Sequence, residues 1–267
     1  MRRPKHSRQP QPFRFGLALL FLLPMSHPAR GEADGLTRLP DLIGRSRQCL
    51  IVTARDWNSS SGQLRLFERV ATDAPWQQHT AAIPIVLGKN GMGWGRGEVV
   101  FDRLGPIKKE GDRRAPAGVF LLGTVFGYAS AKTAAPMKMP YYALTQETEA
   151  IDDPDSRHYN QLLERNSVSR PDWRSSEKMR SDDVRYRWGI FVRQNTAAVA
   201  GAGSCIFLHV WLSPQTATAG CTAMAESDLQ RIIGWLDPAA RPLLVQLPLA
   251  EFAGIERRCF PGVDISR

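Results

Sequence analysis

The stretch Gly203–Met224, GSCIFLHVWLSPQTATAGCTAM, determines the fold and chemistry that we expect. Its first part, Cys205–Trp211 (CIFLHVW), is a short apolar run typical of a buried strand, and it contains His209. A polar loop at 213–218 follows, and then Gly220 and Cys221 precede a predicted helix. Because a helix N-terminus favours the thiolate form of a cysteine, Cys221 is a candidate nucleophile.

His209 is the candidate base for this nucleophile, because the loop can return the chain to the end of the histidine's strand. A neighbouring imidazolium would lower the thiol pKa further. Gly220 allows a sharp turn, so its N–H and that of Cys221 are candidate donors to an oxyanion. Spacing alone leaves two other readings open, namely an inert thiol beside a packed histidine and a structural disulfide between Cys205 and Cys221.

Along the rest of the chain, short runs rich in β-branched and aromatic residues recur between turn residues. They predict a mainly β fold, a sandwich or barrel with a few short helices. The runs are Cys49–Ala54, Gln63–Arg69, Ala82–Leu87, Val119–Val125, Tyr186–Arg193, Cys205–Trp211 and Leu243–Leu247.

Two segments carry helix signals. Ser227 and Gln230 fit a capping box ahead of one apolar face that ends before Pro238. Asp153 and Pro154 fit an N-cap followed by proline at the first helical position, which predicts a second helix.

The N-terminal residues 1–31 are typical of a secretory signal peptide. A basic region with Arg2, Arg3 and Lys5 precedes the apolar run 15–24, and small residues follow it. Six of the 35 Lys and Arg residues and none of the 26 Asp and Glu residues lie in 1–31, so removal of this segment lowers the net charge from +9 to +3. We therefore expect no nucleic-acid partner and no membrane span after signal cleavage. The remaining boundaries are a lead-in at 32–48, a catalytic domain at 49–250 and a C-terminal tail at 251–267.

The four cysteines fit an oxidising compartment, and Cys49 and Cys259, at the two ends of the mature chain, are a candidate disulfide. We expect no metal, since His79, His158 and His209 form no zinc motif. The glycine-rich run 88–97 lacks the pattern of a phosphate loop, and no other cofactor motif is present.

The segment 203–224 resembles the catalytic motif of the L,D-transpeptidase family, the YkuD-type domain. In that motif a histidine and a loop precede Ser/Thr-His-Gly-Cys. His209, Thr218, Gly220 and Cys221 match the motif. Two residues depart from it, because Ala219 replaces the second histidine and Ala223 replaces a polar residue, as in a branch of the family with Thr-Ala-Gly-Cys.

The upstream stretch 109–120, KEGDRRAPAGVF, is similar to the family's Gly-Asp-x-x-Thr-Pro-x-Gly-x-Phe, and the resemblance covers residues 49–248. It implies substrate-binding roles for residues near the motifs. The candidates are Lys109, Asp112, Trp188, Trp211 and Thr218; core packing is the alternative for the two tryptophans.

The resemblance implies a periplasmic enzyme of a Gram-negative bacterium that acts on peptidoglycan stem peptides in cell wall biogenesis and cell shape. Cys221 would attack a stem tetrapeptide, release the terminal D-alanine and form a thioester. His209 would act as general base and acid, oriented by a backbone carbonyl near Val210. An amine acceptor makes the enzyme a transpeptidase, whereas water makes it a carboxypeptidase or endopeptidase. A catalytically inert wall-binding module is the third alternative, and the oligomeric state is left open.

Overall fold

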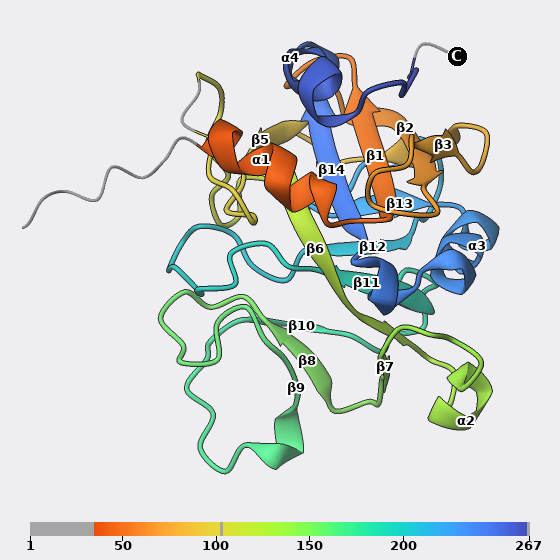
Figure 1. Cartoon of the computed structure of the whole chain (residues 1–267). Helices are drawn as coiled ribbons and strands as arrows, with labels where there is room; N and C mark the ends of the chain where they lie inside the picture. Colours follow the sequence, from red (N-terminus) through yellow and green to blue (C-terminus); the bar gives the residue numbers. More distant parts are fainter. Residues whose placement is uncertain (1–34, 102–103, 266–267) are drawn as a thin grey trace, which may run out of the picture. The chain divides into compact units, whose positions relative to one another are not determined.

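Paired strands close into a β-barrel in the computed structural model, which describes residues 35–101 and 104–265. The barrel runs in the order β1-β14-β6-β11-β12-β13-β4-β2, and β2 pairs back onto β1 (Figure 1). β3 extends β2, while β5 and β7 pair with β6. The mainly β fold with few short helices is the one predicted from the sequence.

All seven predicted strands are present, with ends displaced by a few residues. They are β1 (Gln48–Ala54), β2 (Ser61–Glu68), β4 (Ile83–Val86), β6 (Ala115–Gly127), β11 (Trp188–Val192), β12 (Phe207–Val210) and β14 (Leu243–Pro248). The barrel also contains short strands without a strong sequence signal. These are β3 (Gln77–Gln78), β5 (Met92–Trp94), β7 (Tyr141–Ala143) and β13 (Thr222–Met224).

A separate small sheet has the order β10-β8-β9 and lies below the barrel in the view of Figure 1. Its strands are β8 (Thr148–Ile151), β9 (Leu162–Glu164) and β10 (Ser176–Lys178). The prediction of a helix from Asp153 is wrong, because turns fill the segment between β8 and β9. The Asp153 carboxylate accepts hydrogen bonds from the N–H groups of Asp155 and Arg174, and its contact with Arg174 lowers the pKa of Asp153 to about 2. Asp153 thus fastens a loop instead of capping a helix.

The helices are short. They are α1 (Gly35–Gly44), α2 (Ala131–Ala134), α3 (Glu226–Trp235) and α4 (Leu249–Cys259), with 3-10 turns at Arg165–Ser167 and Pro238–Ala240. The predicted helix at α3 is present, and its face Leu229, Ile232 and Ile233 is buried. The predicted capping box is wrong, because the N-cap residue is Ala225 and Ser227 lies inside the helix.

Both ends of the described chain belong to the same folded unit, which clusters as residues 33–267. Leu39 of α1 and Phe252 of α4 are fully buried in the core, so the segments expected as a lead-in and a tail contribute to packing. The predicted signal peptide at 1–31 lies outside the described residues. Within 35–101 and 104–265, no helix has the length and apolar character needed to cross a membrane.

All four cysteines are free thiols, which corrects the predicted pairing of Cys49 with Cys259. Both are buried in the main core, Cys49 on β1 and Cys259 at the end of α4. The alternative disulfide between Cys205 and Cys221 is also absent from the structure.

Candidate active site

The parallel pairing of β12 with β13 brings the two chemical groups together. His209 lies directly opposite Ala223, and Cys221 lies two residues before Ala223. Since side chains two residues apart point to the same face of a sheet, Cys221 and His209 face the same side. Both line one cavity of about 290 Å³. The sequence-based pairing of these two residues therefore corresponds to a shared site.

The nucleophile candidate does not stand at a helix N-terminus. Cys221 leads into β13, and α3 begins only at Glu226. The helix dipole that we expected to favour the thiolate therefore does not act directly on this sulfur. Instead, Cys221 Sγ accepts a hydrogen bond from the N–H of Phe207 at 3.3 Å and donates to the carbonyl of Cys205 at 3.8 Å.

Cys205 has an unusual backbone that shapes the site. Its φ is 50°, in the left-handed region that costs a residue with a side chain free energy. Asn160 Oδ1 accepts a hydrogen bond from the Cys205 N–H at 2.8 Å, and Asn160 Nδ2 donates to two further carbonyls. These contacts hold the turn that presents the Cys205 carbonyl to the Cys221 thiol.

Thr218 fixes the turn before the nucleophile. Its Oγ1 donates to the carbonyl of Cys221 at 2.6 Å and accepts from the N–H of Gly220 at 3.1 Å. Gly220 has a φ of 155°, and a Cβ there would lie 3.2 Å from the Arg114 carbonyl. Because Thr218 takes the Gly220 N–H, the predicted pair of oxyanion donors is corrected to Cys221 N–H as the remaining candidate.

His209 is buried and has a defined tautomer. Its Nδ1 lies 2.8 Å from the carbonyl of Val210, and since a carbonyl can only accept, Nδ1 carries the proton. Nε2 is then the basic nitrogen. The sequence prediction of an orienting carbonyl near Val210 agrees with this contact. Burial lowers the pKa of His209 to about 4, so the imidazole is neutral at neutral pH.

The Cys221 thiol, like the His209 imidazole, is neutral at neutral pH. Burial, reinforced by the charge of Glu177, raises the pKa of Cys221 to about 12, although the Phe207 N–H and the cations Lys108 and Arg185 act in the opposite direction. Burial therefore opposes the lowering of the thiol pKa that we expected from a helix N-terminus and a neighbouring imidazolium. A neutral thiol beside a neutral imidazole can still react if the proton moves as the sulfur attacks.

The walls of the cavity combine apolar and charged groups. Trp211, Thr218 and Gly220 from the predicted set line it, together with Ala219 and Ala223. The lining residues that the sequence did not indicate include Lys108, Glu110, Asp152, Glu177, Arg185, Tyr186, Ser204 and Cys205. The adjacent Tyr186 ring meets the His209 ring edge-on at 5.5 Å.

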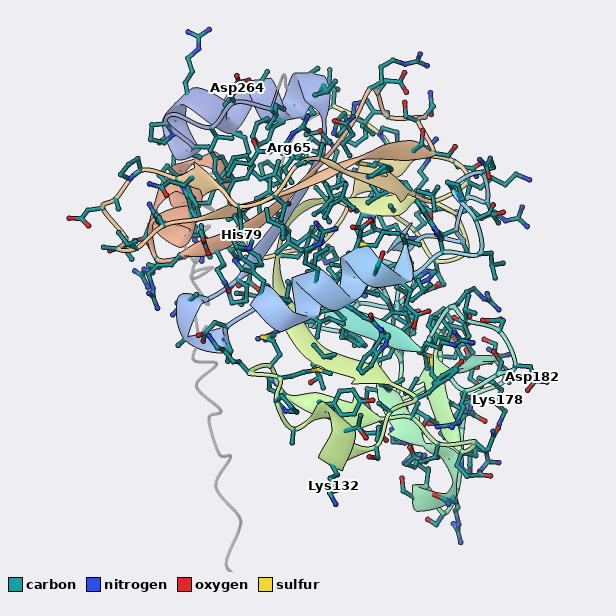
Figure 2. The ribbon with its side chains drawn as sticks, turned by 90° about the vertical axis from the view of Figure 1, so that its right-hand side faces the viewer. Arg65, His79, Lys132, Lys178, Asp182 and Asp264 are labelled. Atoms are coloured by element: carbon teal, nitrogen blue, oxygen red, sulfur yellow. The ribbon has the colours of Figure 1, made fainter. Side chains whose placement is uncertain are left out.

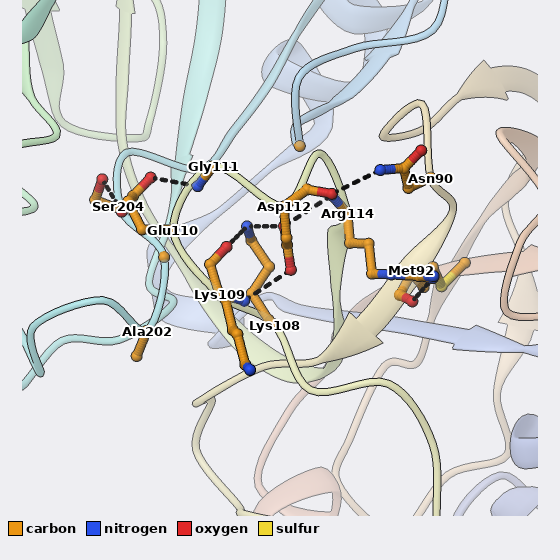
Figure 3. A network of polar contacts seen from close by, with 12 residues as sticks. Asn90, Met92, Lys108, Lys109, Glu110, Gly111, Asp112, Arg114, Ala202 and Ser204 are labelled. Carbon is orange, nitrogen blue, oxygen red and sulfur yellow. Dashed lines mark hydrogen bonds and ion pairs between the residues drawn. The ribbon is translucent and has the colours of Figure 1, made fainter.

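The polar network of Figure 3 assigns structural roles to two predicted substrate-binding residues. The Asp112 carboxylate accepts from the Lys108 ammonium at 2.6 Å and from the N–H groups of Lys109 and Arg114. Lys109 is exposed, and neither Lys109 nor Asp112 lines the cavity, which corrects that prediction. Their neighbours Lys108 and Glu110 line it instead.

Packing explains the positions of the predicted residue Trp188 and of His79. Trp188 packs against the main core and meets Tyr141 at 6.1 Å, away from the cavity lining, so core packing describes it. His79 stacks on Trp235, and Figure 2 shows it on the barrel, remote from Lys178 of the small sheet. No group of three or more metal-binding side chains occurs among the described residues.

Of the missed cavity residues, Glu177 lies on β10, and Arg185 comes from the segment between β10 and β11. No periodic signal pointed to Arg185, because Arg185 and Arg187 lie two residues apart and would share one face of an extended chain. In the structure the chain turns at residues 185–186, and this turn separates the two side chains. Arg187 instead contacts Glu226 of α3, at 3.4 Å. Sequence alone did not show which of the two arginines faces the nucleophile.

The family model of the L,D-transpeptidase catalytic domain, YkuD, matches residues 76–245. This range contains β12, the Thr218 turn and Cys221, and it covers most of the barrel strands. None of the curated proteins and none of the solved structures compared with the chain matches it.

Proposed function

Because this chain belongs to the L,D-transpeptidase family, whose cysteine-dependent enzymes act on peptidoglycan peptides, we propose that it is an exported, periplasmic L,D-transpeptidase acting on stem tetrapeptides. Cys221 is the nucleophile and His209 the general base and acid. The observation that carries this proposal is the shared cavity of Cys221 and His209, with Nδ1 of His209 bound to the Val210 carbonyl. That tautomer leaves Nε2 as the proton acceptor.

Acylation begins when Sγ attacks the carbonyl that links the third residue to the terminal D-alanine. The thiol proton passes to Nε2 as the C–S bond forms, and the Cys221 N–H stabilises the developing oxyanion. When the C–N bond breaks, Nε2 returns the proton to the leaving amine. D-Alanine departs, and the tripeptide remains on Cys221 as a thioester.

Deacylation repeats these steps with a new nucleophile. An acceptor amine attacks the thioester, gives its proton to His209 Nε2 and forms the cross-linking amide. The imidazolium then protonates the departing sulfur, and the thiol is restored. Since Cys221 has a raised pKa and His209 a lowered one, proton transfer accompanies attack instead of preceding it as a stable ion pair.

Hydrolysis is the second candidate, supported by one observation. Ala219 and Ala223 both line the cavity and carry only methyl groups beside the nucleophile. Small side chains leave room for water at the thioester. A carboxypeptidase or endopeptidase would use the same first half-reaction. An inert wall-binding module has less support, because binding alone requires neither the thiol nor the imidazole in this arrangement.

The test is to incubate the purified mature protein with tetrapeptide-bearing muropeptides and an excess of an added D-amino acid. Transpeptidation predicts cross-linked dimers and exchange of the terminal D-alanine. Tripeptide monomers alone would identify the hydrolase. Absence of any product from the wild-type protein, identical to a Cys221→Ala control, would contradict both enzymatic functions.

A further inference from the structure

Arg185 is a cation of the active-site cavity to which neither the family match nor the proposed mechanism gives a role. We propose that Arg185 binds a carboxylate of the stem peptide and thereby selects and positions the acyl donor. This inference rests on the proposed function, because it concerns the substrate of the same cavity.

The guanidinium of Arg185 is held in place by Asp183, but its Nη1 makes only a long contact with another side chain. Its Nε and Nη2 both donate to Asp183 Oδ2, at 2.9 and 2.6 Å. Its Nη1 lies 3.9 Å from Glu177 Oε1, which is beyond a hydrogen bond. The side chain keeps 39% of its exposure, so one edge of a fixed, planar donor faces the cavity. Such an edge suits a carboxylate.

Lys108, the other cation that lines the cavity, already has its hydrogen bonds within the protein. Lys108 retains only 3% exposure, and its ammonium contacts Asp112 and the carbonyl of Lys109, both at 2.6 Å. Breaking these contacts would leave an uncompensated charge in a buried place. Of the lysine and arginine side chains that line the cavity, which are Lys108 and Arg185, Arg185 is therefore the one with donor capacity for a ligand.

Arg185 is also near the reacting groups. Its carbonyl accepts from the N–H of Val210 at 3.1 Å, so its backbone is tied to the residue that follows His209. The charge of Arg185 also affects the pKa values of both Cys221 and His209, lowering each. Ala223, opposite His209, contributes only a methyl group to this wall, so a ligand carboxylate has space beside the base.

Glu177 is the protein carboxyl group that would compete with a substrate carboxylate for Nη1 of Arg185. Burial raises the pKa of its carboxyl, and Arg185 acts against that shift. A substrate carboxylate would approach Nη1 more closely than the 3.9 Å of Glu177 and replace this long contact with a charge-assisted hydrogen bond.

The test compares three stem tetrapeptides, one unmodified, one with a terminal carboxamide and one with a carboxamide in place of a side-chain carboxylate. The enzymes are wild type, Arg185→Gln, Arg185→Lys and the control Arg187→Gln, whose arginine contacts Glu226 outside the cavity. Initial rates and intact-mass acylation of Cys221 give kcat and KM separately. With the wild-type enzyme, one of the two carboxamide peptides should have a kcat/KM about 10- to 100-fold lower than the unmodified peptide. The position of that carboxamide shows which substrate carboxylate Arg185 binds.

In Arg185→Gln the preference for the unmodified peptide over the carboxamide peptide should disappear, and the KM for the unmodified peptide should rise. Arg185→Lys should retain part of this preference, and Arg187→Gln should retain all of it. Equal wild-type rates on all three peptides would overturn the inference, and this result needs no variant to fold. A preference unchanged in Arg185→Gln would overturn it as well. In both cases turnover of the unmodified peptide leaves the proposed function standing, whereas no turnover of any peptide by wild type would reject that function first.

Discussion

Thr218 holds Cys221 through the backbone, with Oγ1 donating to the Cys221 carbonyl at 2.6 Å and accepting from Gly220 N–H at 3.1 Å. The hydroxyl thereby sets the turn that presents the thiol to the cavity. It does so without touching the sulfur, whose hydrogen bonds go to Phe207 and Cys205.

Replacement of this hydroxyl should reduce catalysis. Thr218→Val keeps the size of the side chain but loses both hydrogen bonds, so we expect kcat/KM to fall about tenfold or more and stability to fall by about 1–2 kcal/mol. Thr218→Ser, the control, should stay near wild type. Steady-state kinetics and thermal unfolding give the two values. Wild-type activity in Thr218→Val would contradict the assigned role.

The Asp112 network should matter for stability and not for substrate binding. Asp112→Ala leaves the buried Lys108 ammonium without its counter-charge, so we expect a loss of about 3 kcal/mol in the free energy of unfolding. Lys109→Ala removes an exposed side chain and should change it by less than about 0.5 kcal/mol. Denaturant unfolding compares the two variants. Equal stability of Asp112→Ala and wild type would disprove the structural role.

Alkylation of Cys221 should show a high thiol pKa. With the pKa of Cys221 raised to about 12, the iodoacetamide rate should rise about tenfold per pH unit from pH 7 to 10 without a plateau. Cys49, Cys205 and Cys259 are buried and should react more slowly, so peptide mapping resolves the site. A plateau below pH 8 would instead indicate a preformed thiolate–imidazolium pair.

Acid should destabilise the protein through His209. Its pKa is about 4 when folded and about 6.5 when unfolded, so below pH 6.5 the unfolded chain binds a proton that the folded one excludes. Stability should therefore fall as the pH drops from 6.5 towards 4, by about 2 kcal/mol at pH 5 from this residue.

A difference between variants isolates this contribution from that of the carboxylates. His209→Gln should lose less stability than wild type between pH 7 and 5 in urea unfolding. His79→Gln, which removes a partly exposed histidine beside Glu68, is the control. An identical pH dependence in wild type and His209→Gln would show that His209 is not buried in its neutral form.

The sequence predicted the parts of the molecule that depend on neighbouring residues. The seven predicted strands were visible because apolar, β-branched runs carry a local signal. His209 and Cys221 were found because one segment contains both. The three-residue strand β13 is too short for such a signal, so the helix was placed directly after Cys221. Contacts across the chain were also hidden, as with Asp153, whose carboxylate binds Arg174 instead of capping a helix.

The charged side of the site depends on such distant contacts. Asp112 lay in a motif that the family resemblance linked to substrate, yet the three hydrogen bonds of its carboxylate stay within its own loop. Arg185 reaches the cavity from the segment before β11, and only the folded barrel places it beside β12.

If Cys221 is the nucleophile, it forms a thioester with the stem peptide during each turnover. Wild-type protein should be mixed with a stem tetrapeptide, quenched in acid within its first turnovers, and digested for mass mapping, with Cys221→Ala as the control. We expect a tripeptide adduct on Cys221 and one released D-alanine per adduct. Turnover without an adduct on Cys221, or turnover that persists in Cys221→Ala, would contradict this role of Cys221.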